Sequence, residues 1–332
     1  MKSEILFSGI AVLAVAAQAS AAFTPGNPYG NITNSGIRTT NSLTGLTGYG
    51  DQWTGGSAFI GPLPSAALDY KQTGSPNTID LGIKTVFLDT ITRDAGGVIR
   101  TASTPGGLYT NTFGSFNIAT GNRFGRVDRT GSGPINGIQV EVNSTASNHY
   151  QLGELELLTI QPSANVAFGQ TSIASPGSQA GNMTDEFYNG IGVTEWRASS
   201  NPATNGGQQW TGFEFAGQQS TELKAIRIVT SAPHGLTFVW RDFDIQLKQG
   251  GVWVTQGRAN VPATQDIYWA TFPDYTFAEG VRLFGSTAGG NNPTASGGLI
   301  VDDIFAFVPL PEPSSAILLV GAALGMIRRR RA

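Results

Sequence analysis

The sequence predicts an all-β protein built of two tandem β-sandwiches. Residues 22–310 hold many short runs rich in Val, Ile, Phe, Thr and Trp, separated by clusters of Gly, Asn, Ser and Pro. They show no amphipathic helix pattern of about ten residues or more. Similar segments also recur in the same order in the two halves. The length suffices for two domains of about 145 residues each, so we expect one sandwich in each half.

The predicted strands are short, and several alternate apolar with polar side chains. Residues 138–142 (Ile-Gln-Val-Glu-Val) and 225–229 (Ala-Ile-Arg-Ile-Val) show this alternation, which is typical of a strand with one buried face. Further strands are expected at 85–88 and 281–284. Regular short strands with turn signals between them favour a sandwich or a barrel.

Five pairs of segments suggest that the two halves are copies of one fold. The matched segments are 79–82 with 213–216, 114–118 with 241–245, 136–140 with 279–283, 144–146 with 286–288, and 154–158 with 303–307. The joint falls near residues 161–164. We therefore predict a first sandwich over 22–161 and a second over 162–308. The alternative is a single large β protein whose strands resemble one another.

The N-terminus has the features of a secretory signal peptide over residues 1–21. Lys2 gives a positive start, an apolar run follows over 5–17, and Ala19-Ser20-Ala21 forms a small-residue cleavage site. The apolar run is too short for a comfortable transmembrane helix. Cleavage by signal peptidase is expected; the alternative is a buried N-terminal helix.

The C-terminus, residues 309–332, has three parts in a fixed order. Pro311, Glu312 and Pro313 precede a short apolar membrane segment over 314–327. A basic tail closes the chain with Arg328, Arg329, Arg330 and Arg331. The twelve residues 316–327 cover only about 18 Å as a helix, so spanning requires the flanking serines and snorkelling arginines. The arginines place the bulk of the chain on the extracytoplasmic side.

This tail resembles the PEP-CTERM sorting signal of Gram-negative bacteria. The resemblance implies a second partner, a membrane exosortase that processes the signal during export. It also implies a location at the cell envelope, the cell surface or the extracellular matrix, with membrane anchoring before processing. The alternative is an unprocessed tail anchor with a chance Pro-Glu-Pro sequence.

The second half carries segments of a known type of β-sandwich. They are 165–169 (Asn-Val-Ala-Phe-Gly), 209–215 (Gln-Trp-Thr-Gly-Phe-Glu-Phe), 250–253 (Gly-Gly-Val-Trp) and 280–283 (Gly-Val-Arg-Leu). Over residues 164–308 the chain resembles the discoidin, or coagulation-factor type C, family of galactose-binding-like jelly rolls. The first half resembles it more weakly, with Trp53 at the place of Trp196. The disulfide frequent in that family has no counterpart, because the chain has no Cys.

Composition excludes several classes of function. Charged residues make up 13% of the chain, with two His and no Cys, which excludes Cys-ligated zinc and iron–sulfur sites. Without both terminal segments, 15 basic and 21 acidic residues remain. An acidic body has no general electrostatic attraction for nucleic acid.

The chain shows no motif of hydrolase chemistry, and we predict that it is not an enzyme. It contains no G-x-S-x-G, no P-loop and no H-E-x-x-H. His149 and His234 fall in expected loops. Glu154 and Glu156 share one face of a predicted strand, and this spacing usually marks the solvated face.

The discoidin resemblance implies one structural Ca²⁺ in such jelly rolls, although no cofactor is required. The expected ligands are Glu154 in the first half, and Asp185 with Asp303 in the second. Oxygen ligands suit Ca²⁺. The alternative is that these are solvent-facing carboxylates at strand ends.

Ligand binding is expected at loops on one end of a sandwich, through aromatic platforms and a few polar groups. The candidates are Trp53, Tyr188, Trp196 and Arg197, although Trp196 could instead pack inside. Trp210, Trp240 and Trp253 lie on expected strands and are assigned to the core.

These observations together predict an exported protein of the cell surface or extracellular matrix that binds or organises surface polysaccharide. A structural matrix or coat protein without a specific ligand is the first alternative. An exopolysaccharide-processing enzyme is the second. Ice binding is a remote fourth hypothesis, because Thr110-Asn111-Thr112 is a single T-x-T.

Overall fold

The structure is a computed structural model, and it describes most of the predicted body of the chain. The described residues are 23–32, 58–60, 67–71, 80–90, 95–104, 108–118, 124–142, 150–176, 178, 181–186, 195–198, 208–230, 238–286 and 299–310. Within them every element is a β-strand except one short 3₁₀ turn, η2 (Ala216–Gln218).

The first half forms two four-stranded sheets. The strands are β2 (Ala58–Ile60), β3 (Ala67–Lys71), β4 (Thr85–Thr90), β5 (Ala95–Ala102), β6 (Asn111–Ile118), β7 (Phe124–Asp128), β8 (Gly137–Val142) and β9 (Tyr150–Leu158). One sheet has the order β2-β9-β4-β7 and the other the order β3-β8-β5-β6. All of these neighbours pair antiparallel.

The second half forms a four-stranded and a five-stranded sheet. Its strands include β10 (Thr171–Ala174), β12 (Gln208–Glu214), β14 (Ala225–Val229), β15 (Asp242–Gln249), β16 (Val252–Asn260), β17 (Ile267–Thr271), β19 (Gly280–Ser286) and β21 (Asp303–Phe307). The orders are β1-β17-β14-β21, with β1 (Thr24–Pro25), and β10-β12-β19-β15-β16. Two small pairs complete it: β11 (Trp196–Arg197) with β20 (Ile300–Val301), and β13 (Thr221–Glu222) with β18 (Phe277–Ala278).

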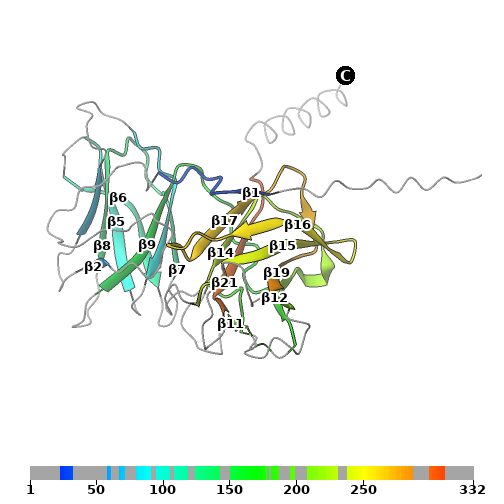
Figure 1. Ribbon diagram of the computed structural model, residues 1–332. Coiled ribbons are helices and arrows are strands. Elements are labelled where there is room, and N and C mark those ends of the chain that lie inside the picture. The colour runs from blue at the N-terminus through cyan, green and yellow to red at the C-terminus, as the bar shows by residue number, and fades with distance from the viewer. Residues whose placement is uncertain are drawn as a thin grey trace, which may run out of the picture.

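Apart from the edge strands β1, β2 and β10, the strand order is the same in the two halves. The run β9-β4-β7 corresponds to β21-β14-β17, and the run β3-β8-β5-β6 corresponds to β12-β19-β15-β16. The predicted all-β fold of β-sandwiches is therefore confirmed, and Figure 1 shows the first-half strands and the second-half strands as two neighbouring bodies.

Two of the five sequence matches fall on corresponding strands, and the match of 144–146 with 286–288 involves residues outside the described part of the chain. Residues 136–140 and 279–283 lie on β8 and β19, and residues 154–158 and 303–307 lie on β9 and β21. The match of 114–118 with 241–245 is displaced, because it joins β6 to β15, whereas β6 corresponds to β16. The match of 79–82 with 213–216 is displaced as well, because β12 corresponds to β3. Short alternating strands resemble one another, so similarity alone does not identify the equivalent strand.

Each sandwich has its own apolar core between its two sheets. In the first, Val86 and Leu88 of β4 pack with Val140 of β8. In the second, Ile226 and Ile228 of β14 belong to the core between the sheets. Each such side chain contributes about 1.5–3 kcal/mol by leaving water.

A third cluster joins the two sandwiches. It contains Tyr29 and side chains on the strand faces that point away from the two separate cores. These strand residues are Phe87, Phe124, Leu158, Ala225, Val229, Ile267, Trp269, Phe305 and Phe307. The four-stranded sheets therefore pack against each other, and four sheets stack in succession. All five residues of β14 and of β21 are buried, since both faces of these strands are covered.

The seam between the sandwiches also buries charges. Arg227 of β14 has no exposed side-chain surface; its Nε donates to Glu156 Oε2 at 3.0 Å and its Nη2 donates to Asp89. The Trp269 indole N–H donates to Glu156 Oε1 at 2.8 Å. Glu156 was predicted on a solvated strand face, and this prediction is wrong. The second sandwich covers that face, and Arg227 compensates the buried carboxylates.

The first described residues connect both sandwiches, which the predicted boundaries did not anticipate. Thr24 and Pro25 form β1, which pairs with β17 of the second sandwich, and Figure 1 shows β1 beside β17. Phe23 packs against the second core and Ile32 against the first. Residues 23–25, which the prediction assigned to the first sandwich, thus complete a sheet of the second, because β17 leaves an edge open to pairing.

Candidate functional site

Several residues and segments singled out in the sequence lie outside the described part of the chain. They are Trp53, Tyr188, His149, His234, the signal peptide and the sorting segment with Pro311–Pro313 and Arg328–Arg331. Glu154 lies in β9 with its backbone opposite Asp89 of β4; its side chain is not described. Among the described residues, no helix combines the length and apolar character needed to cross a membrane.

Trp196 does not present a ring to a ligand. Its side chain is fully buried in the second core and stacks on Trp240, with ring centroids 5.0 Å apart and planes at 25°. We therefore correct the prediction that it forms a binding platform, because a ring with no exposed surface cannot receive a sugar. Trp240, also fully buried, is a core residue as predicted.

Arg197 follows Trp196 on β11 and is half-buried. Its Nη2 donates to the Glu195 carboxylate at 3.2 Å, and Glu195 itself has no exposed side-chain surface. The backbone of β11 pairs with β20, so that Arg197 lies opposite Ile300. The guanidinium thus neutralises a buried carboxylate, and this ion pair accounts for the position of the arginine.

The structure places Asp185 and Asp303 near each other. Asp303 begins β21 and is completely buried, and among the described residues neither of its carboxyl oxygens makes a hydrogen bond of normal geometry. Burial raises the pKa of Asp303 well above its usual value, and repulsion from Asp185 and Glu186 raises it further. The backbone N–H groups of Glu186 and Ile304 offset part of this rise.

The segment 181–186 is held closely against its neighbours. The Ile304 N–H donates to the Met183 carbonyl at 2.9 Å. A Cβ on Gly181 would lie 2.3 Å from the backbone N and O of Glu195, so only glycine permits this approach. Within the described residues no group of three or more His, Cys, Asp or Glu side chains is arranged to hold a metal ion. The calcium site is therefore still a prediction.

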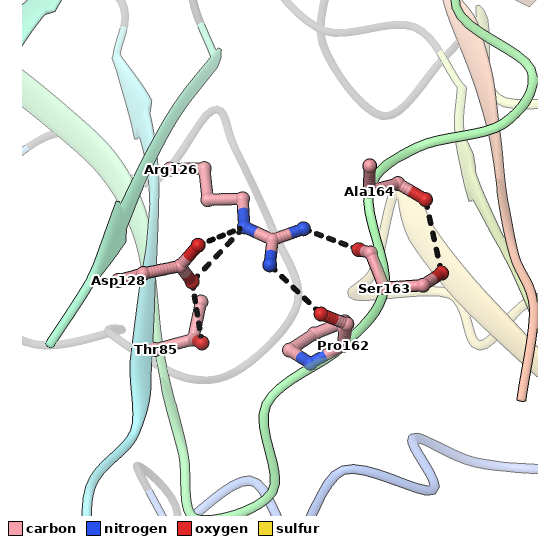
Figure 2. Close-up of polar contacts among 6 residues, drawn as sticks. All are labelled: Thr85, Arg126, Asp128, Pro162, Ser163 and Ala164. Carbon is pink, nitrogen blue, oxygen red and sulfur yellow. Dashed lines mark hydrogen bonds and ion pairs between the residues drawn. The ribbon is translucent and has the colours of Figure 1, made fainter. Parts of the chain in front are cut away.

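A cavity of about 570 Å³ lies at the junction of the two sandwiches. Arg126 of β7 is on its wall, and Figure 2 shows how this guanidinium is used. Its Nε donates to Asp128, and its Nη atoms donate to the carbonyls of Pro162 and Ser163. Asp128 also accepts from the Thr85 hydroxyl at 2.8 Å. Arg126 therefore fixes the connection between the sandwiches, and its donors are directed at the chain itself.

A second candidate surface is the outer face of the five-stranded sheet. Trp210 of β12, Trp253 of β16 and Arg282 and Phe284 of β19 are all partly exposed on this face. The register places Trp210 opposite Phe284. We call Trp210, Trp253, Arg282 and Phe284 the aromatic platform.

Arg282 lies among the three rings of the platform. Its guanidinium carbon is 4.6 Å from the Trp253 ring centroid, 5.2 Å from that of Phe284 and 5.7 Å from that of Trp210. These distances are within the range of cation–π attraction. The arginine Nε donates to Gln246 Oε1 at 2.7 Å, and the Gln246 amide donates to Thr255 at 2.9 Å. Desolvation lowers the pKa of Arg282 below its usual value.

Close packing of the strands supports the platform. A Cβ on Gly212, opposite Arg282 in the register, would lie 2.1 Å from the Val281 carbonyl oxygen and 2.6 Å from Arg282 Cα. Glycine therefore lets β12 approach β19, and it leaves no side chain between Trp210 and the arginine.

The sequence prediction assigned Trp210 and Trp253 to the core, and their partial exposure corrects it. On β12 the inward side chains are the buried Gln209 and Thr211, and Trp210 points outward between them. Each makes a hydrogen bond inside: the Ser175 hydroxyl donates to Gln209 Oε1 at 3.2 Å, and the Thr211 hydroxyl donates to the Ile173 carbonyl at 3.4 Å. The sequence did contain an indication of this: Trp210 and the charged Glu214 are four residues apart on one strand, so their side chains point to the same face.

Comparison with protein-family models and with curated proteins finds no match. The chain is similar to carbohydrate-binding modules of known structure. A fucose-binding module of Streptococcus pneumoniae has 13% identity and a TM-score of 0.33, over 45% of this chain and 100% of that one. A chitosan-binding module of a Paenibacillus chitosanase/glucanase has 16% identity and a TM-score of 0.31, over 43% and 98%.

A third similar structure contains two domains in tandem. The CBM32-1 and CBM32-2 domains of Clostridium perfringens ZmpB have 10% identity and a TM-score of 0.28, over 87% of this chain and 100% of that one. All three TM-scores lie below 0.5, and the fold is established here by the strand order of the two sandwiches rather than by these likenesses.

Proposed function

We propose that this protein is an exported, non-catalytic protein of the bacterial cell surface or extracellular matrix that binds polysaccharide. The aromatic platform on the second sandwich carries the proposal. Aromatic rings on an exposed surface offer apolar faces to the C–H faces of sugars, and neighbouring amide and hydroxyl groups offer hydrogen bonds. The hydroxyl of Thr255, an exposed residue of β16, supplies such a group, and Gln246 links Thr255 to Arg282 beneath the rings.

The arrangement of the sheets supports binding rather than packing as the role of this face. The four-stranded sheet of the second sandwich is covered by the first sandwich, whereas the five-stranded sheet is the last of the four stacked layers. No other described element pairs with or covers it, so its partly exposed tryptophans face solvent. Rigid strands hold these rings in place, which lowers the entropy lost on binding.

Export is the second part of the proposal, and it rests on the terminal segments. A signal peptide over 1–21 would direct the chain to secretion, and a tail over 309–332 would anchor it before an exosortase acts. The absence of Cys from the whole sequence means that stability must come from the cores and the seam.

The test is a binding assay with the purified protein against a panel of soluble polysaccharides, by affinity electrophoresis and calorimetry. Saturable binding that Trp253→Ala weakens at least tenfold is expected. Trp253→Tyr should retain most of the affinity, because it keeps an aromatic face. Val252→Ala is the matched control, since Val252 is the exposed neighbour of Trp253 on the same strand and its side chain points to the opposite face of the sheet.

Two results would overturn the proposal. A flat response across the panel would favour a structural coat protein, and conversion of a polysaccharide to shorter products would favour the processing enzyme. Thermal unfolding of each variant separates a lost contact from a lost fold.

A further inference from the structure

The charge at the centre of the aromatic platform indicates which kind of polysaccharide it binds; this inference rests on the proposed function. Arg282 lies on β19, the middle strand of the five-stranded sheet. Gly212 of β12 and Gln246 of β15 are opposite it in the register. Neither of these two facing residues carries a charge. The charged side chains of Asp244 and Lys248 lie two residues to either side of Gln246 on β15, and each is paired with another residue.

The other basic side chains of this sheet have acidic partners. Lys248 Nζ is 2.9 Å from the Glu214 carboxylate. Arg258 Nε is 2.6 Å from Asp242 Oδ1, and Arg258 Nη1 is 3.3 Å from Asp244 Oδ1.

Arg282 differs from them. Within the described part of the chain, no carboxylate lies within ion-pair distance of it. Its one hydrogen bond there is donated by Nε to the neutral amide oxygen of Gln246, so this contact does not compensate the positive charge. The Nη atoms, which form the outer part of the guanidinium fork, are left for a ligand.

A partly desolvated cation without a counter-ion is unfavourable until an anion arrives. A guanidinium forms two parallel hydrogen bonds with a carboxylate, and the planar geometry gives this pair specificity. The ring of Trp253, 4.6 Å from the arginine, would contact the sugar that carries the acid. A ligand that fits both groups must combine a pyranose ring with a carboxylate.

We infer that the aromatic platform binds an acidic polysaccharide, with a sugar carboxylate paired to Arg282 and the sugar ring against Trp253. The ligand is a uronic-acid polymer rather than a neutral glycan.

The experiment uses polygalacturonate and its fully methyl-esterified form, which share one backbone and differ in charge. The purified protein is titrated with each by calorimetry, with dextran as a neutral reference. Binding to the acid should be at least tenfold tighter than to the ester, and it should weaken as NaCl rises.

Two variants localise the effect. Arg282→Gln should reduce affinity for the acid at least tenfold and leave affinity for the ester unchanged. Arg282→Lys keeps a charge and most of the stem packing but loses the fork, so an intermediate affinity is expected. Arg258→Gln is the matched control: it removes the same charge from the same sheet, at a site that already has acidic partners.

Each contrary outcome has its own meaning. Equal affinity for acid and ester would overturn this inference while the proposed function stands. Absence of binding to these three polymers and to the wider polysaccharide panel would overturn both. If Arg258→Gln weakens binding as much as Arg282→Gln, the attraction is general and the assigned site is wrong.

Discussion

Arg227→Met tests the buried seam between the two sandwiches. The wild-type arginine has no exposed surface, and its side chain lies between two carboxylates, Asp89 and Glu156. Its guanidinium carbon also lies 5.5 Å from the ring centroid of Phe124 in the first sandwich and 5.2 Å from the ring centroid of Phe305 in the second. The substitution would leave two buried carboxylates without their cation.

Removing one partner from a buried ion pair costs about 3–5 kcal/mol of unfolding free energy. For domains of this size, each kcal/mol lowers the melting temperature by about 2–4 °C, so a decrease of roughly 6–20 °C is expected. Guanidinium unfolding followed by tryptophan fluorescence measures the loss, with Trp269 as a reporter inside the seam.

Two further variants make the comparison sharp. Arg258→Met is the control, because this arginine is 56% exposed and its ion pairs should contribute only about 0–1 kcal/mol. The triple variant Arg227→Met, Glu156→Gln and Asp89→Asn removes all three charges and keeps an oxygen to accept the Trp269 N–H; it should recover more than half of the loss. A change below about 1 kcal/mol for Arg227→Met alone would refute the buried seam.

Three other predictions concern the site and the sheets. Burial raises the pKa of Asp303, so the folded state favours the protonated carboxyl. The free energy of unfolding should therefore fall as the pH rises above 3.8, the ordinary pKa of an aspartate. Asp303→Asn should then melt above wild type at neutral pH in EDTA, and Ca²⁺ should raise the melting temperature of wild type only; equal shifts would exclude this carboxylate as a ligand. Gly212→Ala should cost about 1–3 kcal/mol through its clash with the Val281 carbonyl, while the strand control Gly96→Ala, with no atom nearer than 3.8 Å, should cost less. Trp196→Ala should cost about 3–5 kcal/mol in denaturant titrations and leave the polysaccharide affinity of the folded protein unchanged, and a selective loss of affinity would show that our correction is mistaken.

Strand positions were predictable from the sequence because alternation is a local property. Residues 138–142 and 225–229 fall within β8 and β14 as expected. The proximity of Asp185 to Asp303 was implied by the discoidin resemblance, and the structure places the two carboxylates close enough to interact. The burial of Trp240 was likewise predicted.

Faces were harder to assign than strands. Gln209 and Thr211 point into the core while Trp210 points outward. Hydrophobicity alone would predict the reverse, with the tryptophan inside and the two polar side chains outside. Hydrogen bonds inside the core make the polar pair tolerable, and such partners come from distant segments such as Ser175. The aromatic platform was therefore missed.

By itself, the sequence determined that the chain forms short antiparallel strands with one apolar face toward a core, and it supplied the hypotheses of export. Only the tertiary structure decided what covers the second face of each strand. The outer faces of two sheets pack together, so Arg227 and Glu156, which alternation assigns to solvent, are buried as partners. Alternation shows that the two faces of a strand differ, but the partner of each face comes from residues far along the chain.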